Sequence, residues 1–332
     1  MGEEVSVIIC APDCDAVAAA ALAGRAFAGS IELLAYDSND LATFFAPPRQ
    51  ARMRPRYDLV ICGPGLVLHD WDGRLVRPQV IEGLRRFGGT VTWTSAVDWH
   101  PEDRRAVAHL IGEANLRLLG ADRSLAADVF SRCFSADDEY ADSLARFGAG
   151  RLTDEESRAW GDDLARVLAA LRADRAALGE AAWMLADGRR DAAIEMHGDR
   201  ASEMERTINR IAGESAGPAV LMRDHKLVFV DVPADGNAFW EDIARRARES
   251  AEADFALARL AGRRVMILAR GADGRCDLRA WARYVTDMLP GAQAVGGGPQ
   301  AVPIVFGGPT DGPALKERVM ELLASGAHLI RE

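Results

Sequence analysis

The chain has 332 residues and a formal net charge of −10 at pH 7, and 49% of its residues are hydrophobic. This length suffices for two domains with sizeable cores, and no segment approaches the roughly 18 uninterrupted apolar residues of a membrane helix. The acidic start, Met1–Glu4, differs from the basic start of a signal peptide, and the five scattered cysteines do not form a disulfide framework. We therefore expect a cytoplasmic protein with no membrane partner, for which duplex DNA is an unfavourable ligand.

Short apolar runs alternate with helical periodicity along the first 120 residues. The pattern predicts strands near 5–11, 31–36, 58–62, 90–95 and 115–119, and helices near 15–28, 78–87 and 102–112. Such alternation is typical of a doubly wound α/β domain with a mostly parallel sheet.

From about residue 124 to 213 the pattern is almost wholly helical. Strand patterns resume near 219–222, 227–232, 265–268 and 302–306, with helices near 237–261, 277–288 and 312–324. We predict a two-domain α/β protein, in which residues 1–176 form the first domain with a helical extension. Residues 177–213 would form a helical connector, and residues 214–332 a smaller α/β domain with a glycine-rich loop.

Two carboxylates follow the first predicted strand. Asp13 and Asp15 lie between the apolar run Val5–Ala11 and an alanine-rich helix. A parallel sheet binds ligands beyond the carboxyl ends of its strands, and hard divalent cations prefer carboxylate oxygens. This position therefore indicates a metal or phosphate site.

The motifs resemble those of the DHH phosphoesterase superfamily, in particular its RecJ-like branch with an associated C-terminal domain. Asp13-Cys14-Asp15 resembles the first motif, and Asp98-Trp99-His100 takes the place of the Asp-His-His that names the family. The glycines Gly296–Gly298 resemble the phosphate-facing loop of the C-terminal domain. The resemblance implies two divalent cations, usually manganese, in active members.

The same resemblance indicates a degenerate metal site. It implies Asp13, Asp15 and Asp154 as ligands of Mn²⁺ or another divalent metal. However, the middle strand ends in Gly63-Pro64 where the family has a bridging aspartate, and Trp99 replaces the metal-binding histidine. Loss of two ligands is difficult to offset, because metal affinity follows ligand number and charge.

The remaining candidate residues would face the substrate. The resemblance implies catalytic roles for Asp98 and His100 and phosphate contacts for Gly296, Gly297 and Gly298. Arg270, at the end of a predicted strand, could supply a cation to the same crevice. Trp99 could stack on a nucleobase or fill the volume of the lost ligands. Arg270 could equally be an ordinary residue at a strand end, and the glycines an ordinary turn.

Two rearranged ligand sets stay open. His69, Asp70 or Asp72 could replace the missing ligands, although they also fit an exposed turn. Cys10, Cys14 and Cys62 could hold zinc, although buried thiols of this kind more often pack as small hydrophobes.

Two functions are compatible with these observations. One is a metal-dependent phosphoesterase of the phosphodiesterase or exonuclease type, acting on a small nucleotide or a short single-stranded oligonucleotide in a cleft between the domains. The other is a catalytically inactive relative that binds nucleic acid or a protein.

Overall fold

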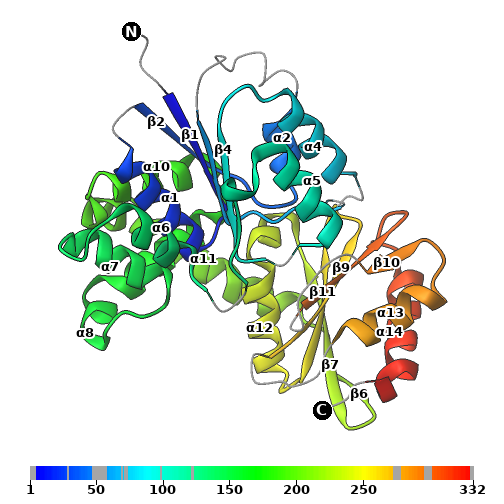
Figure 1. Cartoon of the computed structure of the whole chain (residues 1–332). Coiled ribbons are helices and arrows are strands. Elements are labelled where there is room, and N and C mark those ends of the chain that lie inside the picture. Colours follow the sequence, from blue (N-terminus) through cyan, green and yellow to red (C-terminus); the bar gives the residue numbers. More distant parts are fainter. Residues whose placement is uncertain are drawn as a thin grey trace. The chain divides into compact units, whose positions relative to one another are not determined.

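The structure is a computed structural model, and it describes residues 5–27, 30–46, 58–68, 70, 74–97, 99–120, 123–271, 278–294 and 301–329 (Figure 1). Asp98 and Gly296–Gly298, for which the sequence predicts roles, lie outside the described residues. The chain divides into two compact units, residues 1–68 with 75–202 and residues 69–74 with 203–332. Among the described residues, no helix is both long and apolar enough to cross a bilayer.

The sheet of the first unit has five parallel strands in the order β2-β1-β3-β4-β5. The strands are β1 (Val5–Cys10), β2 (Ser30–Ala35), β3 (Leu59–Cys62), β4 (Val91–Ser95) and β5 (Leu116–Leu118). The chain passes from β1 to one neighbour and then returns to the other, so the strand order reverses between β1 and β3. Ligands of open parallel sheets bind at such a reversal.

Alternate residues of β1 face two separate cores. Ile8 and Cys10 belong to one core, whereas Val7 and Ile9 belong to the other. The second core includes residues of α2 (Leu41–Phe44), α4 (Arg77–Arg86) and α5 (Pro101–Ile111). Helices on both faces of a parallel sheet confirm the predicted doubly wound α/β class.

The first core is built around α1 (Cys14–Ala26), whose residues from Ala16 to Leu22 are completely buried. A helix that is apolar on all sides must be covered on all sides. Its contacts include α6, α7 and α10, which supply much of this cover. The helical region comprises α6 (Leu125–Cys133), α7 (Glu139–Gly148), α8 (Asp154–Glu156), a π-helical turn (Ser157–Gly161), α9 (Asp162–Ala170), a 3-10 turn (Leu171–Ala173), α10 (Arg175–Ala186) and α11 (Arg190–Ser215).

The second unit contains a mixed six-stranded sheet in the order β10-β11-β9-β8-β7-β6. Its strands are β6 (Val220–Met222), β7 (His225–Val232), β8 (Phe255–Leu260), β9 (Val265–Arg270), β10 (Ala292–Ala294) and β11 (Ala301–Phe306). Helix α12 (Trp240–Ser250) covers one face, and α13 (Leu278–Met288) with α14 (Pro313–Gly326) covers the other (Figure 1).

One predicted helix is wrong in its second half. The helix expected over 237–261 ends at Ser250, and Phe255–Leu260 forms β8. Glu252 adopts a left-handed backbone (φ 48°), which ends the helix. The following Phe-Ala-Leu-Ala-Arg-Leu run has strong helix formers, but it pairs with β7 and β9 in the middle of the sheet, and this context overrides local propensity.

Candidate functional site

Asp13 begins helix α1 at the edge where the parallel strands end. Its Oδ1 accepts a hydrogen bond of 2.8 Å from the Ala16 N–H, which caps the helix. Although solvent reaches part of the residue, desolvation by the surrounding protein is the largest effect on this carboxyl group and raises its pKa. The Ala16 N–H and the guanidinium of Arg172 act in the opposite direction.

Asp15 is engaged by a helix that lies more than one hundred positions later in the chain. Its carboxylate accepts hydrogen bonds from Ser124 Oγ (2.6 Å), Leu125 N (2.7 Å) and Ala126 N (2.9 Å). The amide groups at the start of a helix have no partner within that helix, and a carboxylate also interacts favourably with the helix dipole. Asp15 therefore caps α6 and fastens it to α1.

The space around Asp15 is also restricted. A Cβ added at Gly148 would lie only 2.9 Å from Asp15 Oδ1 and 2.6 Å from the Cβ of Ala126. Glycine at this position lets α7 approach the carboxylate closely. The side chain is thus enclosed by α6 and α7 and has both oxygens in use.

The end of β3 cannot carry a ligand in its present form. Gly63 has φ +101°, and an added Cβ would lie 2.7 Å from the Cβ of Ala16 and 2.9 Å from the Cβ of Ala11. The next residue, Pro64, uses its carbonyl to accept a hydrogen bond of 2.8 Å from the Trp93 indole N–H. At this strand end, Gly63 therefore packs closely against α1 and Pro64 accepts a buried hydrogen bond.

Trp99 packs against Trp93. The ring centroids are 4.7 Å apart and the planes are inclined by 79°, which is an edge-to-face contact. Trp99 borders the apolar core that contains Trp93, although its indole nitrogen is buried without a hydrogen-bond partner among the described residues. This contact supports the space-filling alternative for Trp99.

The other predicted residues of the first unit lie at helix starts. His100 directly precedes Pro101 at the beginning of α5 and is exposed. Asp154 is the first residue of α8 and is also exposed. Over the described part of the chain, no three His, Cys, Asp or Glu side chains gather closely enough to hold a metal ion, so Asp13, Asp15 and Asp154 do not form such a group.

The alternative ligand sets gain no support from the structure. His69 and Asp72 lie outside the described residues, while Asp70 caps a turn by accepting from the Arg74 N–H (2.8 Å). Burial raises the pKa of the Cys62 thiol to about 12 and that of Cys14 to about 11, and it raises the pKa of Cys10 as well. Burial therefore favours the neutral thiols, and among the described residues these cysteines do not belong to a cluster that could hold a metal ion.

Sequence reasoning missed two partners of the acidic pair, Ser124 and Arg172. A serine just before an apolar run is a recognisable signal for the start of a helix. Ser124 stands in this position before Leu125 and caps α6. That signal locates the helix but does not reveal that Asp15 binds its first turn. Arg172 carries no local signal at all, since only the fold brings its charge near Asp13.

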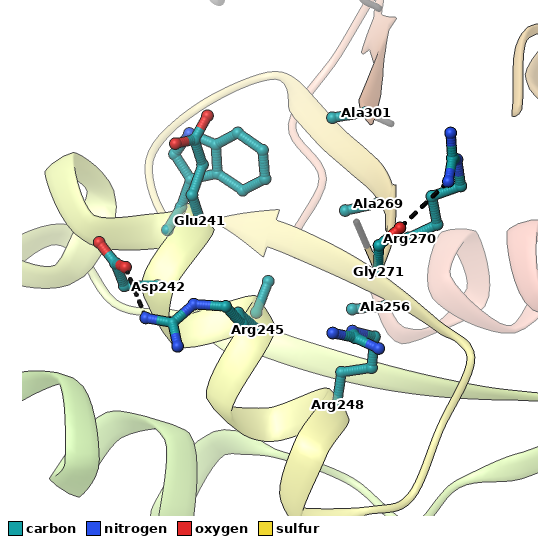
Figure 2. Close-up of a pocket in the computed structure, with 11 residues that line it drawn as sticks. Glu241, Asp242, Arg245, Arg248, Ala256, Ala269, Arg270, Gly271 and Ala301 are labelled. Carbon is teal, nitrogen blue, oxygen red and sulfur yellow. Dashed lines mark hydrogen bonds and ion pairs between the residues drawn. The ribbon is translucent and has the colours of Figure 1, made fainter. Parts of the chain in front are cut away.

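Arg270 belongs to a pocket of about 310 Å³ in the second unit (Figure 2). Its Nη1 donates a hydrogen bond of 3.1 Å to the Gly271 carbonyl. The pocket lies between α12 and the sheet and is lined by Trp240, Glu241, Asp242, Ala244, Arg245, Arg248, Ala256, Ala269, Arg270, Gly271 and Ala301.

The fold is shared with proteins of known structure. RecJ from Thermus thermophilus in complex with Mn²⁺ superposes with a TM-score of 0.60 at 13% identity, covering 98% of this chain and 52% of RecJ. The chain thus spans about half the length of that relative. A second exonuclease RecJ, bound to manganese, gives a TM-score of 0.57 at 14% identity. The match covers 97% of this chain and 90% of that exonuclease chain.

A third structure carries the family name itself. The DHH domain of a member of a family of ribosomal proteins gives a TM-score of 0.53 at 14% identity, covering 99% of this chain and 88% of that one. The chain has a RecJ-like DHH fold. No family model and no curated protein matches the sequence, so the likeness to known proteins rests on the fold.

The two-metal centre implied by this fold does not fit the residues present. A bridging carboxylate would have to extend from Gly63 or Pro64. There is no room for a side chain at Gly63, and the side chain of Pro64 has no atom that can bind a metal. Both oxygens of Asp15 already accept hydrogen bonds from the start of α6. Trp99 supplies no imidazole.

Proposed function

We propose that this chain binds a small nucleotide or a short single-stranded oligonucleotide without hydrolysing it by a two-metal mechanism. The proposal rests mainly on the hydrogen bonding of Asp15, whose two oxygens accept three hydrogen bonds from the start of α6. A dication at this position would have to displace those donors and leave buried amides without partners.

Phosphate binding remains compatible with the residues present. The RecJ-like fold supports a phosphate-bearing ligand, although fold alone does not determine function. Arg270 would contribute a fixed cation in the second unit, and His100 an exposed imidazole in the first. Arginine suits this role because its planar fork of donors matches phosphate oxygens.

The test combines metal analysis, a manganese titration by calorimetry and a hydrolysis assay with a 5′-phosphorylated dinucleotide and decanucleotide. We expect no stoichiometric manganese and no turnover, but measurable binding of the short ligands. The Asp13→Asn variant serves as the control for any residual hydrolysis.

Two outcomes would contradict the proposal. Tight binding of two manganese ions, with a manganese-dependent turnover that Asp13→Asn abolishes, would favour the phosphoesterase. Absence of binding for every nucleotide and oligonucleotide would instead favour a protein-binding role.

A further inference from the structure

The pocket beside α12 has a flat apolar floor made of three alanines. Ala269 in β9 is the register partner of both Ala256 in β8 and Ala301 in β11. Partnered residues on adjacent strands project from the same face of a sheet, so the three methyl groups form one row (Figure 2). Ala269 and Ala301 are partly exposed beneath the helix, whereas Ala256 is buried at the end of the row.

Helix α12 forms the wall above this floor. Trp240, Ala244 and Arg248 recur every four residues, so they share the side of the helix that lines the pocket. Trp240 is buried, with 9% of its surface exposed, and Arg248 is half-buried. The wall is therefore apolar at one end and cationic at the other.

Arg248 is a guanidinium without a counterion in the part of the chain that the structure describes. Its neighbour Arg245 donates to Asp242 at 2.9 Å, whereas Arg248 makes no side-chain hydrogen bond or ion pair with a described residue (Figure 2). The Arg248 group lies directly over Gly271, since a Cβ there would be 2.7 Å from Nη1. A half-buried, unpaired guanidinium favours an anionic partner.

The charges that line the pocket differ between the two ends of helix α12. Glu241 lines the end near the start of α12, and Arg248 lies seven residues further on. Seven residues of α-helix extend about 10 Å. An anion is therefore favoured at the Arg248 end and disfavoured at the Glu241 end.

Size, floor and charge together describe one class of ligand. A volume of about 310 Å³ is at the lower end of the range for small-molecule sites. A flat apolar floor suits a planar ring, and a guanidinium suits a phosphate. We propose that this pocket binds a mononucleotide, with its base over the alanine row and its phosphate at Arg248. The proposal rests on nucleotide binding by this chain and places one such ligand within the second unit.

Calorimetry on the full chain tests this proposal with adenosine and guanosine 5′-monophosphate, the two nucleosides and inorganic phosphate. We expect at least one monophosphate to bind, and to bind more tightly than its nucleoside or phosphate alone. Arg248→Ala should weaken it roughly 10- to 100-fold, because a hydrogen bond to a charged group is lost. Arg246→Ala removes an exposed arginine of the same helix that does not line the pocket, and it should leave the affinity unchanged.

A second variant probes the floor. Ala269→Leu places a larger side chain in the middle of the alanine row and should abolish binding of the monophosphate. Ala269 is partly exposed, so the fold should accept the change, and an unchanged melting temperature would confirm this.

The outcomes separate this proposal from the proposed function. If the natural protein binds a monophosphate and both pocket variants bind it equally well, the ligand lies elsewhere and only the pocket assignment is wrong. If oligonucleotides bind but neither monophosphate does, the pocket assignment is again wrong. If no nucleotide or oligonucleotide binds, both proposals are wrong.

Discussion

At the scale of single residues, the two carboxylates near the N-terminus each accept hydrogen bonds from the start of a helix. Asp13 caps its own helix and Asp15 caps a distant one. A charged acceptor at a helix start is stabilising by itself and needs no metal. Carboxylates at the end of a strand can therefore contribute to folding without holding a metal.

This role predicts a large loss of stability for Asp15→Ala. The change removes three hydrogen bonds and leaves the Leu125 and Ala126 amides without their acceptor. We expect the free energy of unfolding to fall by about 2–4 kcal/mol in urea denaturation. Asp154→Ala is the matched control, since that carboxylate is exposed at a helix start, and it should cost less than about 1 kcal/mol.

The same measurement distinguishes a helix cap from a metal ligand. The difference between the two variants should persist in EDTA and should not grow when manganese is added. Equal losses from both variants would show that the three hydrogen bonds of Asp15 contribute little to stability. A loss that appears only with manganese would show that Asp15 acts as a ligand instead.

At the scale of elements, the contact between the end of β3 and helix α1 depends on one glycine. Gly63→Ala would combine an unfavourable backbone angle with a clash against the methyl groups of Ala16 and Ala11. We expect it to lower the free energy of unfolding by about 2–5 kcal/mol. Gly150 also has a positive φ (+63°), but an added Cβ there meets nothing within 4 Å.

Gly150→Ala therefore isolates the backbone cost, which should be about 1–2 kcal/mol. Urea denaturation of the two variants compares them directly. If Gly63→Ala is no more destabilising than Gly150→Ala, the strand end has room for a side chain, and the argument against a bridging ligand there fails.

The short helix α8 gives a prediction about pH. The pKa of Glu156 is lowered from 4.5 to about 2, mainly by hydrogen bonds from Arg146 and to a smaller extent by those from Thr153. A carboxyl group whose pKa is lower in the folded state than in the unfolded state stabilises the protein. This stabilisation is complete when the pH is above the pKa of the group in the unfolded chain. This contribution should be lost as the pH falls from about 4.5 to about 2.

Comparison of the natural protein with Glu156→Gln over this pH range checks the assignment. The difference in melting temperature between them should be largest near neutral pH and should shrink on acidification. A difference that is constant with pH would mean that the charge of Glu156 contributes nothing to stability.

At the scale of the whole molecule, charge limits the choice of ligand. A net charge of −10 opposes approach of a long polyanion, whereas a short ligand can be held by a few local cations. We expect a duplex of about 30 base pairs to bind with a dissociation constant above about 100 μM at physiological salt. Fluorescence anisotropy across salt concentrations measures this, and tight binding with a steep salt dependence would reveal a basic surface that the composition conceals.

Much of the fold was determined by the sequence alone, because strand and helix periodicity are properties of neighbouring residues. The run Val5–Ala11 predicted β1, and the unbroken small apolar residues after it predicted the buried helix α1. The order of these elements sufficed for the doubly wound class. Phe255–Leu260 is an exception, since its neighbours favour a helix and only pairing with β7 and β9 makes it a strand.

The chemistry of the candidate sites was decided by tertiary structure. The sequence located Asp15, but its donors on α6 are 109 to 111 positions away. The pocket floor likewise requires the register of three strands, which aligns Ala256, Ala269 and Ala301. Contacts between distant segments depend on how the whole core packs, and no local pattern of residue types encodes such a partner.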